Sequence, residues 1–380
     1  MSQASNEQAI SMEQEQILSL FCLNGTPVSC TPLGTGHINE TYLVRCDADG
    51  AIYEYVLQRL NTEVFQKPLE VMENIVRVTA WIRKQLEEAG EDPHRGTLTF
   101  LPAKDGRFCV LIGNECWRVC EYIADAAAYE QTEDVRFLRE SAYAFGRFQL
   151  MLRDFPAREL HETIVDFHNT PKRYAAFLEA VRRDLSGRQE QAAEEIRFLK
   201  EHEDLSCILS KAYEEGRLPL RVTHNDTKLS NVMMDPQTGK AVCVIDLDTV
   251  MPGFSVTDFG DAIRTGASTA AEDEPDLSKV HFDLQRYLYY VEGFAAGTGG
   301  GLTQAEYDLL PYGALVITYE QALRFLTDFL DGDLYYKTDY PDHNLVRART
   351  QIRMIAEMLE HLEEMKIGPA SAGYAAADYR

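Results

Sequence analysis

Four polar side chains fall at fixed intervals in the middle of the 380-residue sequence. His224, Asp226 and Asn231 share one short segment, and Asp246 follows after two apolar runs joined by the turn-forming stretch 236–239. Because an antiparallel hairpin brings the two ends of its chain segment together, we expect Asn231 and Asp246 to lie side by side. An amide oxygen and a carboxylate at that place suit one hard cation such as Mg²⁺.

The same segment contains the groups that phosphoryl transfer requires. Asp226 is placed to accept the proton of a substrate hydroxyl, and Lys228 adds a positive charge in the same loop. A His-x-Asp sequence, an Asn five residues after the Asp, and a further Asp beyond a hairpin form the spacing of protein kinases. Each residue alone would predict only a buried histidine or a turn. In this register they predict that Asp226 and Lys228 are catalytic and that Asn231 and Asp246 bind Mg²⁺.

Two kinds of hydrophobic pattern predict the elements that position this loop. Short β-branched and aromatic runs, with one helical stretch among them, predict a small sheet-plus-helix lobe with strands at 28–33, 41–45, 53–57, 108–112 and 116–123 and a helix at 69–88. Helical periodicity dominates afterwards, at 135–152, 174–184, 189–216, 283–294, 303–332 and 344–365, and the glycine-rich stretch 297–301 predicts a loop. The predicted fold class is α+β with two lobes, residues 1–123 and 124–380, and a central catalytic hairpin.

Charge and cysteine content limit the possible partners. The 61 Asp+Glu residues exceed the 37 Lys+Arg residues, and the net charge of −24 argues against binding to nucleic acid or to an anionic membrane surface. Eight cysteines are too sparse for a disulfide framework, and the N-terminal residues do not resemble a signal peptide. We therefore expect a cytoplasmic protein with small-molecule partners. The sequence leaves open whether it is a monomer or a homodimer.

The chain resembles the aminoglycoside phosphotransferase and choline kinase superfamily, whose members have a bilobal protein-kinase-like fold. The resemblance is carried by the segments 34–39, 223–231, 245–253 and 258–264. Two outer segments, 266–269 and 340–347, resemble the bacterial N-acetylhexosamine 1-kinases more narrowly. This resemblance implies that ATP is the phosphoryl donor, that Mg²⁺ is the cofactor, and that GlcNAc or GalNAc is phosphorylated at its anomeric hydroxyl with Asp226 as the base.

The resemblance also implies roles for residues outside the catalytic loop. Asp248 would support a second ion or its waters, and Asp258 and Arg264 would brace the catalytic loop by hydrogen bonds. The backbone of Glu121 and Ile123 would bind the adenine edge.

The nucleotide side has one departure from the protein-kinase pattern. Gly34 and Gly36 allow backbone N–H groups to approach phosphates closely, and His37 and Asn39 offer further donors. Protein kinases have a lysine on the third strand, whereas Gln58 stands at that position here. A neutral amide gives the phosphates less charge, which leaves the preferred nucleotide open.

Arg59 does not replace the missing lysine, because side chains alternate along a strand and Arg59 should face away from Gln58. The helix residue Glu73, which would pair with that lysine, is expected to be an ordinary surface residue.

The main candidate for binding the acceptor is Arg324, whose guanidinium stands among apolar neighbours in the sequence. Arg324 requires a partner, which is either Asp328 one turn on or a substrate hydroxyl, and the resemblance favours the substrate. Thr249 and Tyr335 are further candidates for binding the acceptor.

Two other functions stay open at this point. One is a kinase of the same superfamily for choline, an aminoglycoside or another sugar. The other is a non-catalytic regulator that binds a nucleotide or a sugar. The missing third-strand lysine favours the regulator, and the intact Asp226, Asn231 and Asp246 argue against it.

Overall fold

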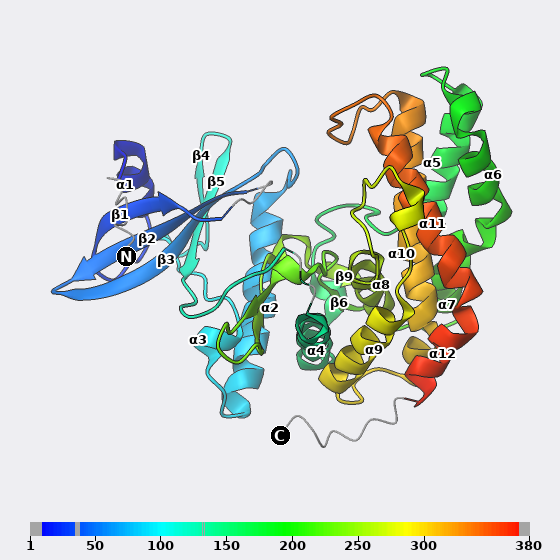
Figure 1. Ribbon diagram of the computed structural model, residues 1–380. Coiled ribbons are helices and arrows are strands. Elements are labelled where there is room, and N and C mark those ends of the chain that lie inside the picture. The colour runs from blue at the N-terminus through cyan, green and yellow to red at the C-terminus, as the bar shows by residue number, and fades with distance from the viewer. Residues whose placement is uncertain (1–9, 35–38, 131, 133, 372–380) are drawn as a thin grey trace, which may run out of the picture. The chain divides into compact units, whose positions relative to one another are not determined.

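The structure is a computed structural model that describes residues 10–34, 39–130, 132 and 134–371, with side chains as far as Lys366. It consists of two compact units (Figure 1). Unit 1 comprises Met1–Ala126 together with Val242–Val250, and unit 2 comprises Ala127–Ala241 together with Met251–Arg380. The segment Val242–Val250, which contains Asp246, therefore groups with the N-terminal part of the chain although the expected lobes assigned it to the C-terminal part.

Unit 1 is built on a five-stranded antiparallel sheet with the strand order β1-β2-β3-β5-β4. Its elements are α1 (Met12–Leu18), β1 (Thr26–Pro32), β2 (Glu40–Ala48), β3 (Ala51–Leu60), α2 (Pro68–Glu88), α3 (Pro93–Gly96), β4 (Val110–Ile112) and β5 (Glu115–Glu121). The β2–β3 turn has the predicted chemistry, because Asp49 and Gly50 adopt positive φ angles of 55° and 90°. The predicted order of strands and helix in this unit is confirmed.

The two faces of this sheet have different environments. Leu57, Trp117 and Val119 pack in a hydrophobic cluster that also contains residues of α1. Because successive side chains alternate, Gln58 and Arg118 lie on the opposite face, where an Arg118 Nη1 atom is 3.7 Å from the sulfur of Met72 on α2. A polar pair is thus enclosed between the sheet and α2.

Unit 2 is mainly helical, with a small sheet of β6 and β9 paired antiparallel. Its α-helices are α4 (Val135–Met151), α5 (Thr170–Arg183), α6 (Ala193–Glu201), α7 (Ile208–Glu214), α8 (Ser255–Gly266), α9 (Leu284–Thr298), α10 (Gln304–Asp331), α11 (His343–Glu360) and α12 (Leu362–Ser371). The strands are β6 (Arg221–Thr223), β7 (Val232–Met234) and β9 (Met251–Gly253), and β8 (Ala241–Val244) continues into unit 1. The predicted turn between β7 and β8 is closed by a 2.8 Å hydrogen bond from Asp235 N–H to the Lys240 carbonyl oxygen.

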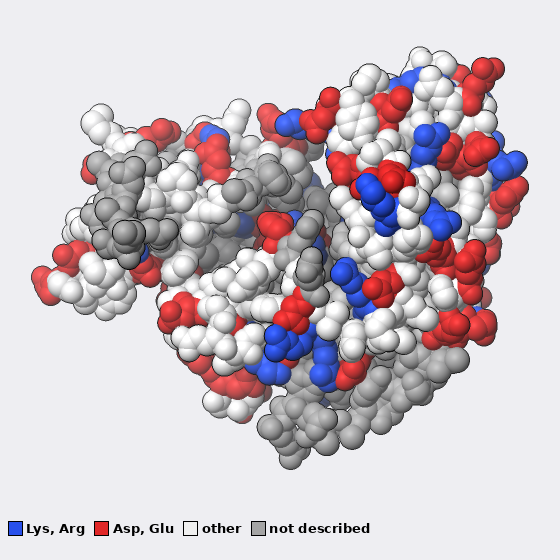
Figure 2. All heavy atoms as spheres, in the orientation of Figure 1, with Lys and Arg blue, Asp and Glu red and all other residues white. Residues whose placement is uncertain are grey.

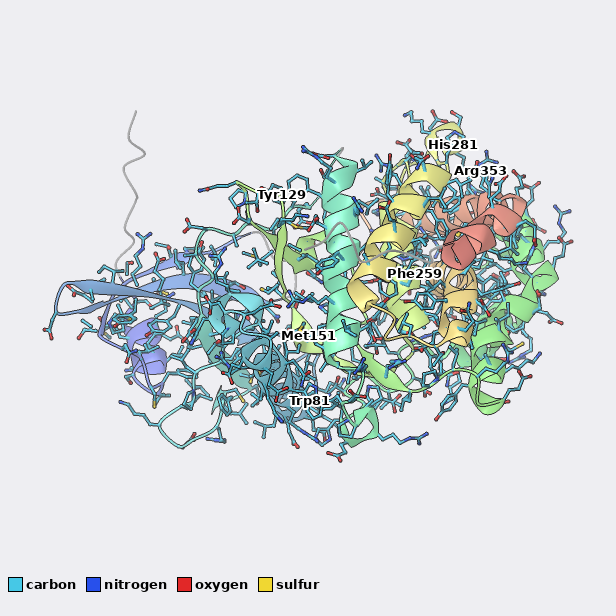
Figure 3. All side chains as sticks on the ribbon, turned by 90° about the horizontal axis from the view of Figure 1, so that it is seen from below. Trp81, Tyr129, Met151, Phe259, His281 and Arg353 are labelled. Carbon is cyan, nitrogen blue, oxygen red and sulfur yellow. The ribbon has the colours of Figure 1, made fainter. Side chains whose placement is uncertain are left out.

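Two helical predictions were incomplete. The single helix expected at 189–216 is two helices, α6 and α7, separated near His202, whose Nδ1 lies 2.9 Å from the Phe198 carbonyl oxygen. Helix α8 was not predicted, because several of its buried residues are of types that favour turns and helix ends over helix interiors, namely Ser255, Thr257, Asp258 and Gly260. Its Phe259, labelled in Figure 3, lies on this helix. The Phe259 ring packs edge-on against the rings of Tyr290 and Phe294.

Charged side chains of both signs are interspersed on the face seen in Figure 2, with no large area of one sign. Among the described helices, none combines the length and the apolar character that crossing a membrane requires.

A buried ion pair joins β6 to the start of α10. The Glu306 side chain is fully buried and accepts two 2.7 Å hydrogen bonds from Arg221 and one from Ser255. Burial by itself raises the pKa of Glu306, but these donors outweigh it and lower the pKa below its ordinary value. A lowered carboxyl pKa stabilises the fold above the pKa of the unfolded chain, and that stabilisation is lost as the pH falls through the folded pKa.

We expect the Glu306→Gln variant to lose about 3–5 kcal/mol of unfolding free energy at pH 7, because Arg221 keeps a buried charge without a counter-ion. The difference from wild type should shrink as the pH falls below about 4.3, the ordinary glutamate pKa, where the wild-type carboxylate begins to be protonated. Urea unfolding at pH 7 and at acidic pH measures both. Glu363→Gln, which changes an exposed glutamate, serves as the control. A loss of unfolding free energy in Glu306→Gln that is equal at both pH values would contradict the lowered pKa of Glu306.

Candidate active site

The predicted catalytic loop, residues 224–231, begins where β6 ends. His224 is fully buried, and its ring meets the rings of Phe145 and Phe148 on α4 at centroid distances of 5.4 and 6.1 Å. Its Nδ1 accepts a 3.3 Å hydrogen bond from the backbone N–H of Asp226. His224 therefore has a structural role: it fixes the backbone that carries Asp226.

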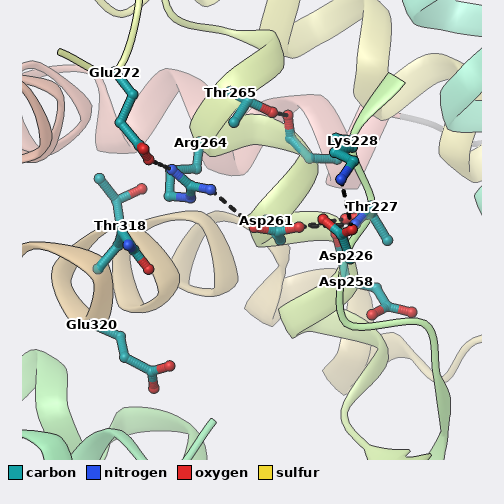
Figure 4. A network of polar contacts seen from close by, with 12 residues as sticks. Asp226, Thr227, Lys228, Asp258, Asp261, Arg264, Thr265, Glu272, Thr318 and Glu320 are labelled. Carbon is teal, nitrogen blue, oxygen red and sulfur yellow. Dashed lines mark hydrogen bonds and ion pairs between the residues drawn. The ribbon is translucent and has the colours of Figure 1, made fainter. Parts of the chain in front are cut away.

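The carboxylate of Asp226 contacts the ammonium group of Lys228 (Figure 4) and the side-chain amide of Asn231. Asn231 Nδ2 donates to the Asp226 carbonyl oxygen at 2.8 Å and to Asp226 Oδ2 at 2.9 Å, and Lys228 Nζ is 2.9 Å from the same Oδ2. A third of the Asp226 side chain is exposed, so a substrate hydroxyl can reach it. Because the amide nitrogen of Asn231 faces Asp226, its amide oxygen is the atom oriented to bind a cation.

Asp258, on α8, holds the backbone of the loop by hydrogen bonds. Its two oxygens accept 2.8 Å hydrogen bonds from the backbone N–H groups of His224 and Asn225, and Oδ2 also accepts from Gln149 at 2.9 Å. Burial raises the pKa of Asp258, and the N–H donors oppose that effect. The prediction that Asp258 braces the loop is confirmed.

A second brace starts from the same helix. Asp261 Oδ2 accepts from the backbone N–H of Thr227 at 2.8 Å, and Asp261 Oδ1 is 3.5 Å from the guanidinium of Arg264 (Figure 4). Arg264 also pairs with Glu272. Arg264 thus supports the loop through Asp261, which agrees with its predicted bracing role. Asp261 itself was not predicted from the sequence.

We expect the Asp258→Ala variant to be destabilised by roughly 3 kcal/mol or more, because it leaves three buried donors without their acceptor at about 1–3 kcal/mol each. Urea unfolding measures the loss. Asp308→Ala, which removes an exposed carboxylate that accepts a hydrogen bond from Gln304 one turn before it, is the matched control. Equal stability of the two variants would show that Asp258 does not support the loop.

The predicted metal ligands belong to different units: Asn231 to unit 2 and Asp246 to unit 1. That they share one ion stays a prediction. The part of the chain that the structure describes contains no group of three or more His, Cys, Asp or Glu side chains suited to a metal.

Asp248 differs from its expected role. It is almost fully buried in unit 1, its Oδ1 pairs with Arg118, and its Oδ2 accepts a 2.7 Å hydrogen bond from Asn39 Nδ2. Both oxygens are therefore engaged by protein side chains, and the expected support of a second ion is replaced by this ion pair. Arg118 itself was not identified from the sequence.

The predicted nucleotide-binding residues lie in unit 1 as far as they are described. Gly34 has a φ of 76°, which favours glycine, whereas Gly36 and His37 lie outside the described residues. Gln58 donates to Thr41 at 3.1 Å and accepts from Arg118 at 3.1 Å.

Glu121 is the last residue of β5, and the buried Ile123 lies beyond the strand. The Glu121 side chain binds His94. Their contact with adenine stays a prediction.

On the acceptor side, the structure brings Arg324 and Tyr335 together. The Arg324 guanidinium lies 5.9 Å from the ring centre of Tyr335, 5.6 Å from that of Tyr336 and 5.9 Å from that of Phe167. Asp328 is not its partner, because Asp328 accepts from the backbone N–H groups of residues 334–336. Thr249 belongs to unit 1.

Two cavities of unit 2 border the catalytic loop. One has a volume of about 670 Å³ and is lined by Thr227, Lys228 and the segment 268–272 among others. The other has a volume of about 380 Å³ and is lined by Asn225, Phe167 and His168 among others. Both fall in the size range of small-molecule sites, so either can hold one acceptor molecule.

Comparison with solved structures identifies proteins of the same fold. The microcompartment-associated aminopropanol kinase is 18% identical, with a TM-score of 0.58, over 93% of this chain and 97% of its own. An aminoglycoside phosphotransferase from Alicyclobacillus acidocaldarius is 15% identical, with a TM-score of 0.56, over 97% and 99%. A spectinomycin phosphotransferase bound to ADP and spectinomycin is 10% identical, with a TM-score of 0.56, over 94% and 100%. At these identities the likeness concerns the fold.

The family assignment rests on the sequence. Residues 29–292, more than half of the chain, match the profile described as the phosphotransferase enzyme family. The matched region includes the catalytic loop with Asp226 and Asn231, the segment with Asp246, and the brace Asp258. The chain therefore belongs to the phosphotransferase enzyme family.

Proposed function

We propose that the protein is an ATP- and Mg²⁺-dependent kinase that phosphorylates the anomeric hydroxyl of an N-acetylhexosamine, GlcNAc or GalNAc, to give the sugar 1-phosphate. The observation that carries the proposal is the cluster of Asp226, Lys228 and Asn231, which places a partly exposed carboxylate beside a cation and an amide. The same groups occur together in phosphoryl transfer.

In the proposed reaction Asp226 accepts the proton of the anomeric hydroxyl while the hydroxyl oxygen forms a bond to the γ-phosphorus of ATP. The bond between that phosphorus and the bridging oxygen of the β-phosphate breaks, and ADP leaves. Lys228 stabilises the negative charge near the transferred group. Asn231 and Asp246 would hold Mg²⁺, which when bound neutralises charge on the β- and γ-phosphates.

The surroundings of Arg324 favour a neutral acceptor. Aromatic rings recognise ammonium ligands such as choline by attracting a cation to their faces. Here the faces of Phe167, Tyr335 and Tyr336 already surround the guanidinium of Arg324, which repels a further cation. A guanidinium with Gln321 beside it can instead donate hydrogen bonds to hydroxyl and acetamido oxygens.

The outer segment 340–347, which resembles the sugar 1-kinases, supports an acceptor site at Arg324 and Tyr335. Asn344 Nδ2 donates to Asp328 and to Asp333, at 2.8 and 2.9 Å. These bonds hold the turn that carries Tyr335, so the segment 340–347 positions the proposed acceptor residues.

The second candidate is a kinase for a cationic alcohol, which the net charge of −24 favours. The Arg324 environment opposes it. Phosphorus NMR of the purified protein with ATP and Mg²⁺ distinguishes the two, with GlcNAc, GalNAc, choline or an aminoglycoside added to separate samples. We expect a sugar 1-phosphate signal with an N-acetylhexosamine, and its loss in Asp226→Asn.

Intact ATP with both sugars would overturn the sugar assignment. A phosphorylated choline or aminoglycoside would then identify the second candidate. Intact ATP in every sample, with ADP still bound, would favour a non-catalytic nucleotide-binding protein.

A further inference from the structure

Gln58 stands on the third strand of unit 1 where protein kinases have a lysine, and the paired position of the neighbouring strand is a buried arginine, Arg118. Gln58 on β3 and Arg118 on β5 are directly paired in the sheet register. Arg118 Nε donates to Gln58 Oε1 at 3.1 Å, and the Arg118 side chain is only 3% exposed. The charge that the protein-kinase pattern places at the third strand is therefore present one strand away.

Arg118 is directed toward the segment that contains the predicted metal ligand. It forms an ion pair with Asp248, and the carboxylate of Asp246 also acts on it electrostatically. A guanidinium is always protonated in proteins, so the buried Asp248 carboxylate has a permanent counter-ion. Without that charge, the buried Asp248 carboxylate would lose its ion-pair partner.

The same ion pair reaches the glycine-containing turn. Asp248 Oδ2 accepts from Asn39 Nδ2 at 2.7 Å, and Asn39 Oδ1 accepts from the backbone N–H of Asn61 at 3.0 Å. One continuous set of contacts thus joins Gln58, Arg118, Asp248 and Asn39, all in unit 1.

Helix α2 contacts this segment through a buried amide. The fully buried Asn74 donates to the carbonyl oxygen of Val250 at 2.9 Å, whereas Glu73 is exposed, as expected. The helix therefore contacts the end of the segment Val242–Val250 through a neutral group, and the cation comes from the sheet.

We infer that Arg118 is the positioning residue for nucleotide and metal binding in this chain, in place of the third-strand lysine, because it binds Gln58 and pairs with Asp248. Asp248 lies two residues after the predicted metal ligand Asp246 and binds Asn39. The inference rests on the proposed function for the identity of the ligand. Arg118 acts through its neighbours, since its side chain is buried and binds Gln58 and Asp248.

Binding of ADP with Mg²⁺, measured by calorimetry, tests the inference independently of turnover. We expect Arg118→Met to weaken ADP binding at least about tenfold, and the Arg118→Met/Gln58→Lys double variant to recover part of that loss, because the added ammonium restores a cation beside Asp248. Arg118→Lys keeps the charge but loses the forked donors, and should weaken binding less than Arg118→Met. Arg59→Met removes the neighbouring, partly exposed arginine and is the matched control.

The outcomes separate the two proposals. Unchanged ADP affinity in Arg118→Lys overturns the inference, and so does a folded double variant that does not recover ADP affinity. The result for Arg118→Lys decides the matter even if Arg118→Met fails to fold. A structural role alone would lower the melting temperature of these variants without a rescue of ADP affinity by the Gln58→Lys substitution. Wild-type protein that binds ADP but phosphorylates no sugar overturns only the proposed function, and wild-type protein that binds neither ADP nor ATP overturns both.

Discussion

The Asp226→Asn variant is expected to lose kcat by about 10²–10⁴-fold, the range over which a positioned general base contributes. Asparagine keeps the size of the side chain and can still contact Asn231 and Lys228, but it cannot accept the proton of the acceptor hydroxyl. The KM for ATP should change little, because the predicted nucleotide-binding residues lie in unit 1. Steady-state kinetics with the sugar that is turned over measures both constants.

Asp154→Asn is the matched control, since Asp154 is an exposed residue of unit 2 that pairs with its neighbour Arg153. Its kcat should equal that of wild type. A kcat for Asp226→Asn within a few-fold of wild type would exclude Asp226 as the base.

The Gly293→Ala variant is expected to be strongly destabilised, because α4 and α9 cross at backbone contact. A Cβ atom at Gly293 would lie 2.2 Å from the Arg139 carbonyl oxygen, and one at Gly297 would lie 2.2 Å from the Tyr143 carbonyl oxygen. These obstacles are helix backbone, so the helices themselves must separate. Overpacking of this kind typically costs about 1–3 kcal/mol, and a backbone obstacle places this site at the upper end.

The effect should extend to activity, because α4 carries Phe145, which packs on His224, and Gln149, which binds Asp258. Thermal unfolding and kcat are measured together. Gly266→Ala is the control: its Cβ would meet only the end of the Leu138 side chain, which can move. A melting temperature of Gly293→Ala equal to that of the control would contradict the close crossing.

The parts of the site that depend on local spacing could be predicted from the sequence. Asp226 and Asn231 are five residues apart in one loop, so their contact follows from the motif. The strands of unit 1 were recognised because β-branched runs and an Asp-Gly turn are signals within a few residues. The bracing role of Asp258 followed from the family resemblance, and the structure supplied its partners.

The remaining features depend on contacts that no short window contains. Arg118 faces Gln58 only because β3 and β5 pair across 60 residues, and Asp248 meets Arg118 across 130. The stretch 297–301 was predicted as a loop, yet Gly297 is the last glycine of α9 and lies in the crossing with α4. Glycine in a loop and glycine at a close helix contact look alike in a single sequence.

The division of unit 1 into two chain segments has a consequence for synthesis of the protein on the ribosome. When Ala126 leaves the exit tunnel the sheet and α2 are present, but the carboxylate partner of Arg118 is not yet made. At translation rates of about 5–20 residues per second, Val250 follows roughly 6–25 s later. During that interval the nascent sheet holds an arginine without its counter-ion, and α2 has no Val250 carbonyl to bind. The N-terminal unit therefore cannot complete its fold in the order in which it is made, and waits for a segment from the far side of the catalytic loop.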